Sequence, residues 1–188
     1  MNLPQSWIYQ LFSPLNFEDS VQSQQGVYTL KLRQARMADR PTIRKAEMAD
    51  ATGIKDCVEA AYRRYIPRTG QKPGPMLDDY SKVISRHQAF VLEESCQVIG
   101  VAVLVTGEGG MLLDNVAVHP DPQGEGLGRQ LMEFAENEAL KQGFTSLDLY
   151  THESMTENIG LYESLGYIET DRRAENGFRR VYMWKNLA

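Results

Sequence analysis

Residues 113–129 read Leu-Asp-Asn-Val-Ala-Val-His-Pro-Asp-Pro-Gln-Gly-Glu-Gly-Leu-Gly-Arg. The apolar start has the length of a strand, the His-Pro pair closes it, and a glycine loop leads into an amphipathic helix over 126–142. The first N–H groups of a helix lack partners, and glycines let a ligand approach the backbone closely. We therefore predict a pyrophosphate site at Gly124, Gly126 and Gly128.

The elements around this stretch predict one α/β domain, because strand-like and helix-like patterns alternate from Thr42 to Trp184. Pro67 is expected to end the first helix, and Asp78 with Asp79 to lie in the first turn of the second. We predict a central mixed, mostly antiparallel sheet flanked by about four helices. The expected order is a strand at 42–46, helices at 54–65 and 77–85, strands at 89–93, 98–105 and 111–118, a helix at 126–142, a strand at 146–150, a helix at 158–165, and strands at 167–170 and 179–184.

Composition narrows the class of protein. The chain has 188 residues, of which 42% are hydrophobic and 24% charged, as in one globular domain. A net charge of −5 argues against nucleic-acid binding, and the absence of an apolar run of about 18 residues argues against a membrane partner. Cys57 and Cys96 have no metal-ligand spacing and are too few for a disulfide framework, so we expect no metal and a cytoplasmic location.

The first 40 residues differ from the rest of the chain. Their hydrophobic positions follow no sustained period, and residues 19–25 are polar and rich in Gln and Ser. We expect residues 1–40 to form an irregular N-terminal appendage and residues 41–188 to form the domain. One hypothesis is that the native chain begins at Met37 and lacks residues 1–36.

Two common phosphate-binding motifs do not fit the glycine loop. A dinucleotide fingerprint needs its third glycine one residue later and an acidic ribose ligand about 20 residues on. A P-loop needs Gly-Lys followed by Ser or Thr, which is missing here.

The run Gln123-x-x-Gly126-x-Gly128, followed by Arg129, resembles the acetyl-CoA motif of the GNAT superfamily of N-acetyltransferases. That motif is Arg or Gln, two residues, Gly, one residue, then Gly or Ala. The resemblance extends over about residues 42–184 and leaves out the N-terminal appendage. It implies the GNAT fold, in which the cofactor cleft lies between two splayed strands.

The same resemblance implies acetyl-CoA as the cosubstrate. The backbone of 123–129 would hold the pyrophosphate, through Gln123, Gly124, Gly126, Gly128 and Arg129. The backbone of Val116, Ala117 and Val118 would bond the pantetheine arm as if the arm were an added strand. In this family a β-bulge on that strand aims an N–H group at the thioester carbonyl.

A second stretch supports the resemblance. Asn158 and Tyr162 are four residues apart and share a helix face, which is similar to the family's Asn and Tyr element. By that resemblance Asn158 contacts the cofactor and Tyr162 is the general acid that protonates the leaving CoA thiolate. A phenol with a pKa near 10 is protonated at neutral pH and suits this role, whereas the structural alternative is a buried packing Tyr.

The base that takes the proton of the acceptor amine has no sequence signature. Asp114, His152 and Glu153 are the candidates, and the alternatives are surface charge, hydrogen-bonded loop residues or a water chain. In the region expected to bind the acceptor, Asp78 and Asp79 either attract a cationic amine or serve as helix-dipole partners.

The implied function is that of an acetyl-CoA-dependent N-acetyltransferase, an acyltransferase that moves an acetyl group directly to a primary amine. Two alternatives stay open: a protein N-terminal or lysine acetyltransferase, and a non-catalytic acyl-CoA-binding regulatory module. The implied partners are acetyl-CoA and an amine acceptor of unspecified identity, and a homodimer is left open.

Overall fold

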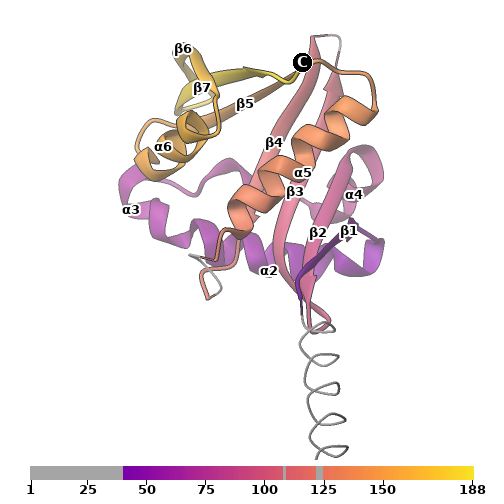
Figure 1. The fold of residues 1–188 in the computed structure, drawn as a ribbon. Coiled ribbons are helices and arrows are strands. Elements are labelled where there is room, and N and C mark those ends of the chain that lie inside the picture. Colours follow the sequence, from indigo (N-terminus) through magenta and orange to yellow (C-terminus); the bar gives the residue numbers. More distant parts are fainter. Residues whose placement is uncertain (1–39, 108, 122–124) are drawn as a thin grey trace, which may run out of the picture. The chain divides into compact units, whose positions relative to one another are not determined.

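The computed structural model describes residues 40–107, 109–121 and 125–188 (Figure 1). Pro41–Ala188 form one compact unit. The appendage expected at residues 1–40 lies outside the described residues except for Arg40, as do Met37, Gln123 and Gly124.

A seven-stranded sheet forms the centre of this unit, in the order β1-β2-β3-β4-β5-β7-β6. Neighbouring strands run antiparallel except β4 and β5, which run parallel. The predicted mixed, mostly antiparallel α/β sheet is thus confirmed, and it is open. The strands are β1 (Thr42–Lys45), β2 (Gln88–Glu94), β3 (Gln97–Gly107), β4 (Gly110–Val118), β5 (Ser146–His152), β6 (Ile168–Glu175) and β7 (Phe178–Asn186).

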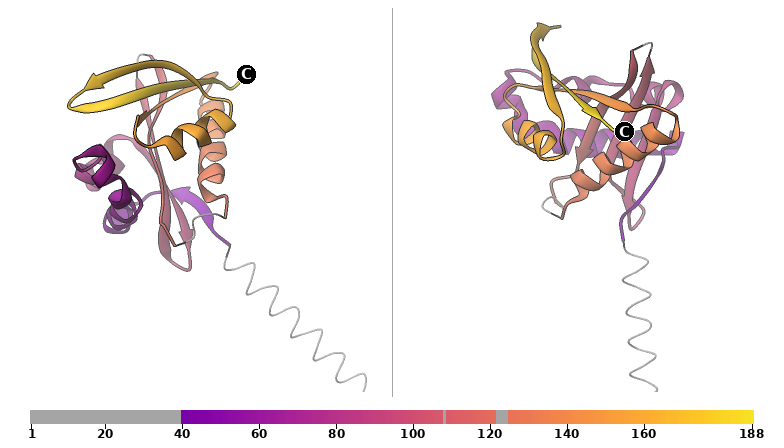
Figure 2. Two further views of the ribbon diagram at one scale, coloured as in Figure 1. Left: turned by 90° about the vertical axis from the view of Figure 1, so that its left-hand side faces the viewer. Right: turned by 45° about the horizontal axis from the view of Figure 1, so that its top comes forward.

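Helices cover both faces of the sheet (Figure 2). One face packs on α5, where Leu131 and Met132 are fully buried. The other packs on α2 and α4, where Ile54 and Val58 are fully buried. Burying each such side chain contributes about 1.5–3 kcal/mol. The helices are α2 (Ala51–Tyr62), α3 (Ile66–Thr69), α4 (Tyr80–Arg86), α5 (Leu127–Lys141) and α6 (Thr156–Ser164). None of these, nor any other helix in the described part of the chain, is long and apolar enough to cross a lipid bilayer.

The segment between α2 and α4 differs from the prediction. Pro67 does not end the first helix, because α2 ends at Tyr62 and Pro67 lies in the first turn of α3. Proline is harmless there, since N–H groups in a first turn have no intrahelical acceptor. Asp79 is the residue before α4, not part of its first turn, and its side chain accepts hydrogen bonds from the N–H groups of Ser81 and Lys82.

A β-bulge at Asp114 shapes β4. Val103 of β3 pairs with Asn115, whereas the next residue of β3 pairs with Leu113, so Asp114 is an extra residue. Because of this extra residue, the side chains that follow it point to the opposite face of the sheet from the one that simple alternation along β4 would give. Leu113 belongs to the core on the α5 face, whereas Ala117 belongs to the core on the α2 face.

The strands β4 and β5 separate just where this bulge lies. They pair only from Met111 to Leu113 on β4 and from Leu147 to Leu149 on β5. Beyond these positions the two strands no longer pair with each other, although β4 continues to Val118 along β3 and β5 continues to His152 along β7. The expected pair of splayed strands is therefore β4 and β5.

Candidate active site

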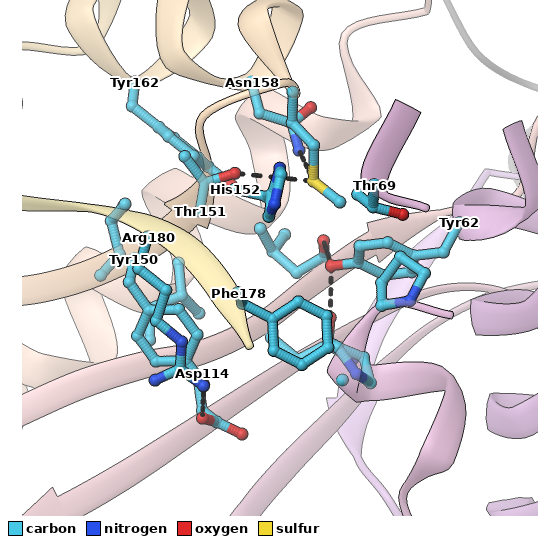
Figure 3. A pocket seen from close by; sticks show the side chains of 18 of the residues that line it. Tyr62, Thr69, Asp114, Tyr150, Thr151, His152, Asn158, Tyr162, Phe178 and Arg180 are labelled. Carbon is cyan, nitrogen blue, oxygen red and sulfur yellow. Dashed lines mark hydrogen bonds between the residues drawn. The ribbon is translucent and has the colours of Figure 1, made fainter. Parts of the chain in front are cut away.

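Two adjoining cavities open where β4 and β5 diverge. The first, which we call the α5 cavity, has a volume of about 370 Å³ and lies at the N-terminus of α5. The second, the β5 cavity, has a volume of about 220 Å³ and lies along the end of β5 (Figure 3). Among the described residues, both cavities share Tyr62, Val116, Asn158 and Tyr162. These residues form the junction at which ligands in the two cavities would meet.

The start of α5 provides N–H groups to the α5 cavity. Gly126 precedes the helix with φ of +79°, a left-handed conformation that favours glycine. No side chain caps this end, and the first N–H with an intrahelical acceptor is that of Gln130. The N–H groups of residues 127–129 are thus available to an anion, which the helix dipole also favours.

Most of the residues predicted to bind the cofactor line this cavity. They are Val116, Ala117, Val118, Gly126, Gly128, Arg129 and Asn158. A Cβ added at Gly128 would meet only a side-chain carbon of Leu161, at 3.9 Å, so the space over Gly128 belongs to the cavity. Arg129 donates a hydrogen bond of 3.3 Å to the Ser164 hydroxyl and so links α5 to α6.

Helix α6 places Asn158 and Tyr162 at the junction (Figure 3). Tyr162 is 5% exposed, and its hydroxyl makes no hydrogen bond to another residue in the described ranges. Burial, together with the nearby Tyr65, raises the pKa of Tyr162 above its usual value near 10. The Tyr162 hydroxyl therefore keeps its proton at neutral pH and has it free to donate.

The end of α6 fixes this arrangement. Gly166 has φ of +91°, its N–H donates to the Glu163 carbonyl, and the Tyr167 N–H donates to the Tyr162 carbonyl, both at 3.0 Å. These two bonds form a Schellman motif, which closes the helix one turn after Tyr162.

The comparison with known families agrees with the geometry of this site. The chain matches the family model of the acetyltransferase (GNAT) domain over residues 85–169. That segment contains β4, the start of α5, and α6 with Asn158 and Tyr162. By this match, residues 85–169 belong to a GNAT acetyltransferase domain.

Relatives and solved structures of the GNAT superfamily share this fold. A ribosomal protein bS18-alanine N-acetyltransferase of Escherichia coli is 36% identical over 88 residues, which is 47% of this chain and 60% of that relative's length. The PaiA N-acetyltransferase of Thermoplasma acidophilum, solved with coenzyme A, is 17% identical with a TM-score of 0.67 over 78% of this chain and 98% of that one. A GNAT family acetyltransferase of Elizabethkingia anophelis with acetyl-CoA bound is 20% identical with a TM-score of 0.61 over 79% of this chain and 99% of that one.

The three candidates for the general base do not all lie in one cavity. Asp114 and His152 line the β5 cavity, whereas Glu153 does not line it and pairs with Arg179 at 2.9 Å. The structure thus brings together two of the three. Asp114 accepts a hydrogen bond of 2.7 Å from the Tyr150 hydroxyl.

His152 has the surroundings of a neutral imidazole. Its Nδ1 lies 2.8 Å from the Ser154 hydroxyl and 3.2 Å from the Ser154 N–H. Burial lowers the pKa of His152 below its usual value of about 6.5, while Glu153 raises it and Arg179 lowers it. At neutral pH His152 is therefore mostly uncharged and able to accept a proton.

The two acidic residues of the expected acceptor region, Asp78 and Asp79, also lie in different places. Asp78 lines the β5 cavity, whereas Asp79 caps α4. Burial and the charge of Asp114 raise the pKa of Asp78 above 3.8. The cavity thus holds two carboxylates, together with Arg180, whose guanidinium lies 4.0 Å from the Tyr150 ring centroid.

Sequence reasoning missed several residues of the site. Tyr62 falls in the apolar spacing of the first helix, which marks no role for its hydroxyl, yet it lies at the junction of both cavities. Tyr150, Phe178 and Arg180 lie on paired strands β5 and β7, and no local signal marks them. The described residues contain no group of three or more His, Cys, Asp or Glu arranged to hold a metal ion.

Proposed function

We propose that this protein is an acetyl-CoA-dependent N-acetyltransferase that moves an acetyl group directly to a primary amine. The observation that carries the proposal is the junction, where a cavity with an anion-binding helix N-terminus meets a second cavity with a neutral imidazole and carboxylates. Its place between the splayed strands matches the site implied by the GNAT fold.

Residues of the α5 cavity suit acetyl-CoA. The N–H groups of residues 127–129 would hold the pyrophosphate, together with Gln123 and Gly124 outside the described residues. The backbone of Val116–Val118, which lies beyond the last pair of β4 with β5, would bond the pantetheine arm. Acetyl-CoA supplies the activated acyl group. A backbone N–H at the Asp114 bulge would polarise the thioester carbonyl of acetyl-CoA.

The chemistry then needs one proton donor and one proton acceptor. Tyr162 donates its free hydroxyl proton to the departing thiolate. His152 takes the proton of the amine, since its lowered pKa leaves it neutral. Holding both reactants at the junction removes about 7–11 kcal/mol of barrier. Neither Cys57 nor Cys96 lines either cavity in the described ranges, which favours direct transfer.

A second candidate is acetylation of a protein N-terminus. The observation that favours it is the Escherichia coli relative, which is named as acting on an alanine of ribosomal protein bS18. The chain spans only about 60% of that relative's length, so the acceptor does not transfer directly. A non-catalytic acyl-CoA-binding module is the third alternative, and the free Tyr162 hydroxyl argues against it.

Ligand-induced stabilisation followed by an acceptor screen tests the proposed function. Acetyl-CoA and CoA at 100 times their Kd should stabilise the fold by about 2.7 kcal/mol, and NAD should not. The Tm should rise by about 5–10 °C for a domain of this size. Thiol release would then be measured with small primary amines and with peptides that begin with alanine. No stabilisation by acetyl-CoA, or no transfer to any amine, would contradict the proposal.

The base assignment makes a pH prediction. Because burial lowers the pKa of His152, it loses base function only as pH falls through a value below 6.5. Wild-type kcat/KM should therefore show an acidic limb below pH 6.5, beyond the slope from the amine itself. His152→Gln should lower kcat/KM about 100-fold and abolish this limb. A limb that persists in His152→Gln and disappears in Asp114→Asn would assign the base to Asp114.

A further inference from the structure

A chain of buried hydrogen bonds begins at Tyr62. Its hydroxyl lies 2.8 Å from Asn115 Oδ1 and 3.3 Å from the Val116 carbonyl oxygen. Asn115 Nδ2 lies 3.1 Å from the Tyr80 hydroxyl, which in turn lies 2.8 Å from the Pro75 carbonyl oxygen. Asn115 and Tyr80 are each 4% exposed.

This chain fixes the direction of every proton in it. The Pro75 carbonyl can only accept, so the Tyr80 hydroxyl donates its one hydrogen there. Tyr80 can then only accept from Asn115, which requires the amide nitrogen to face Tyr80 and the amide oxygen to face Tyr62. Both groups facing the Tyr62 hydroxyl are therefore acceptors, and its hydrogen points toward them.

The consequence appears at the junction of the two cavities. The hydrogen of Tyr62 is committed to Asn115 or to Val116, so the hydroxyl presents only lone pairs to the cavities that it lines. Burial raises the pKa of Tyr62 well above its usual value, which keeps this hydrogen in place. Tyr162, in contrast, makes no hydrogen bond to another described residue, so its hydrogen is available to donate. The junction thus contains one tyrosine that only accepts and one that can donate.

We propose that Tyr62 orients the attacking amine by accepting one of its two N–H hydrogens, and that Asn115 and Tyr80 are positioning residues that hold Tyr62 in the accepting state. The inference rests on the proposed function. A neutral primary amine attacks through its single lone pair, so its two hydrogens must point elsewhere. Tyr62 takes one of them as a hydrogen bond, and His152 removes the other as the N–C bond forms and the C–S bond breaks.

This assignment predicts a preference for primary over secondary amines. A neutral N-methyl amine has one N–H hydrogen, which the base requires, so its methyl group would lie against the Tyr62 oxygen. That oxygen would then lose its partner inside a buried site. Tyr62 therefore sets the acceptor specificity of the enzyme.

The test compares the fastest primary amine of the acceptor screen with its N-methyl derivative. In the wild-type protein kcat/KM should be at least about tenfold higher for the primary amine, as expected for loss of one buried hydrogen bond. In Tyr62→Phe this ratio should fall by about tenfold, because the accepting oxygen is gone, while the Kd of acetyl-CoA changes less than about threefold. Tyr80→Phe tests the positioning role, because it removes the group that orients the Asn115 amide but keeps the Tyr62 oxygen, so its ratio should fall between those of the wild type and Tyr62→Phe.

The outcomes separate this inference from the proposed function. A wild-type protein that transfers acetyl to amines without preferring the primary one overturns the inference and leaves the function standing. The same holds if Tyr62→Phe keeps the wild-type ratio. If Tyr80→Phe keeps the wild-type ratio while Tyr62→Phe loses it, the positioning role of Asn115 and Tyr80 is overturned. A wild-type protein that acetylates no amine overturns the proposed function, and the inference with it.

Discussion

Tyr162→Phe is expected to lower kcat about 100-fold or more while the Kd of acetyl-CoA changes less than about threefold. The variant keeps the ring that fills the junction and removes only the hydroxyl, which makes no hydrogen bond to another described residue. It therefore costs little in packing but leaves the departing thiolate without its proton donor. Such a loss in kcat at constant affinity marks an interaction made only in the transition state.

Steady-state thiol release and calorimetric titration with acetyl-CoA would measure the two quantities. Tyr167→Phe is a matched control, because Tyr167 is also a buried tyrosine, with its ring centroid 6.1 Å from that of Tyr162, but lines neither cavity in the described part of the chain. Its kcat should equal that of the wild type. If Tyr162→Phe turned over at the wild-type rate, the general acid would have to be another group or water.

Gly128→Glu is expected to weaken acetyl-CoA binding at least about 100-fold. A carboxylate at this position would occupy the α5 cavity and place a negative charge where the pyrophosphate binds. The fold should persist, because Gly128 has no left-handed conformation and an added Cβ meets only Leu161 at 3.9 Å. Gly126 is less suitable for this test, since its φ of +79° would add backbone strain.

Gln130→Glu controls for the added charge. Residue 130 lies in the same first turn of α5 but does not line the α5 cavity, and an acidic group there suits the helix dipole. Thermal-shift titrations would compare both variants with the wild type. Tight acetyl-CoA binding by a folded Gly128→Glu protein would refute the pyrophosphate site.

Local patterns predicted the fold well because its elements have strong periodicity. The strand, glycine loop and helix at 113–129 fixed the place of the α5 cavity, and the four-residue spacing fixed the shared face of Asn158 and Tyr162. The prediction for Pro67 was wrong. A proline disfavours the helical conformation at the residue before it, but it can still lie in the first turn of a new helix, as it does in α3.

The acceptor side could not be predicted in the same way. Asp78, Tyr150 and Arg180 meet in one cavity only because β5 pairs with β7 and the segment before α4 reaches β4. Such long-range proximity leaves no mark in a local pattern. The hydrogen-bond direction at Tyr62 is even harder to predict from the sequence, because it depends on the Pro75 carbonyl, which acts through the side chains of Tyr80 and Asn115.

The short pairing of β4 with β5 has a mechanical meaning. Three residue pairs join the two halves of the sheet, whereas each half is held together by longer antiparallel ladders. The line between the halves is thus the weakest seam of the sheet, and the ligand cavities lie along it. A molecule that bonds to β4 beyond Leu113 would replace the pairing that β5 does not make there, so that binding would complete the sheet as well as fill the site.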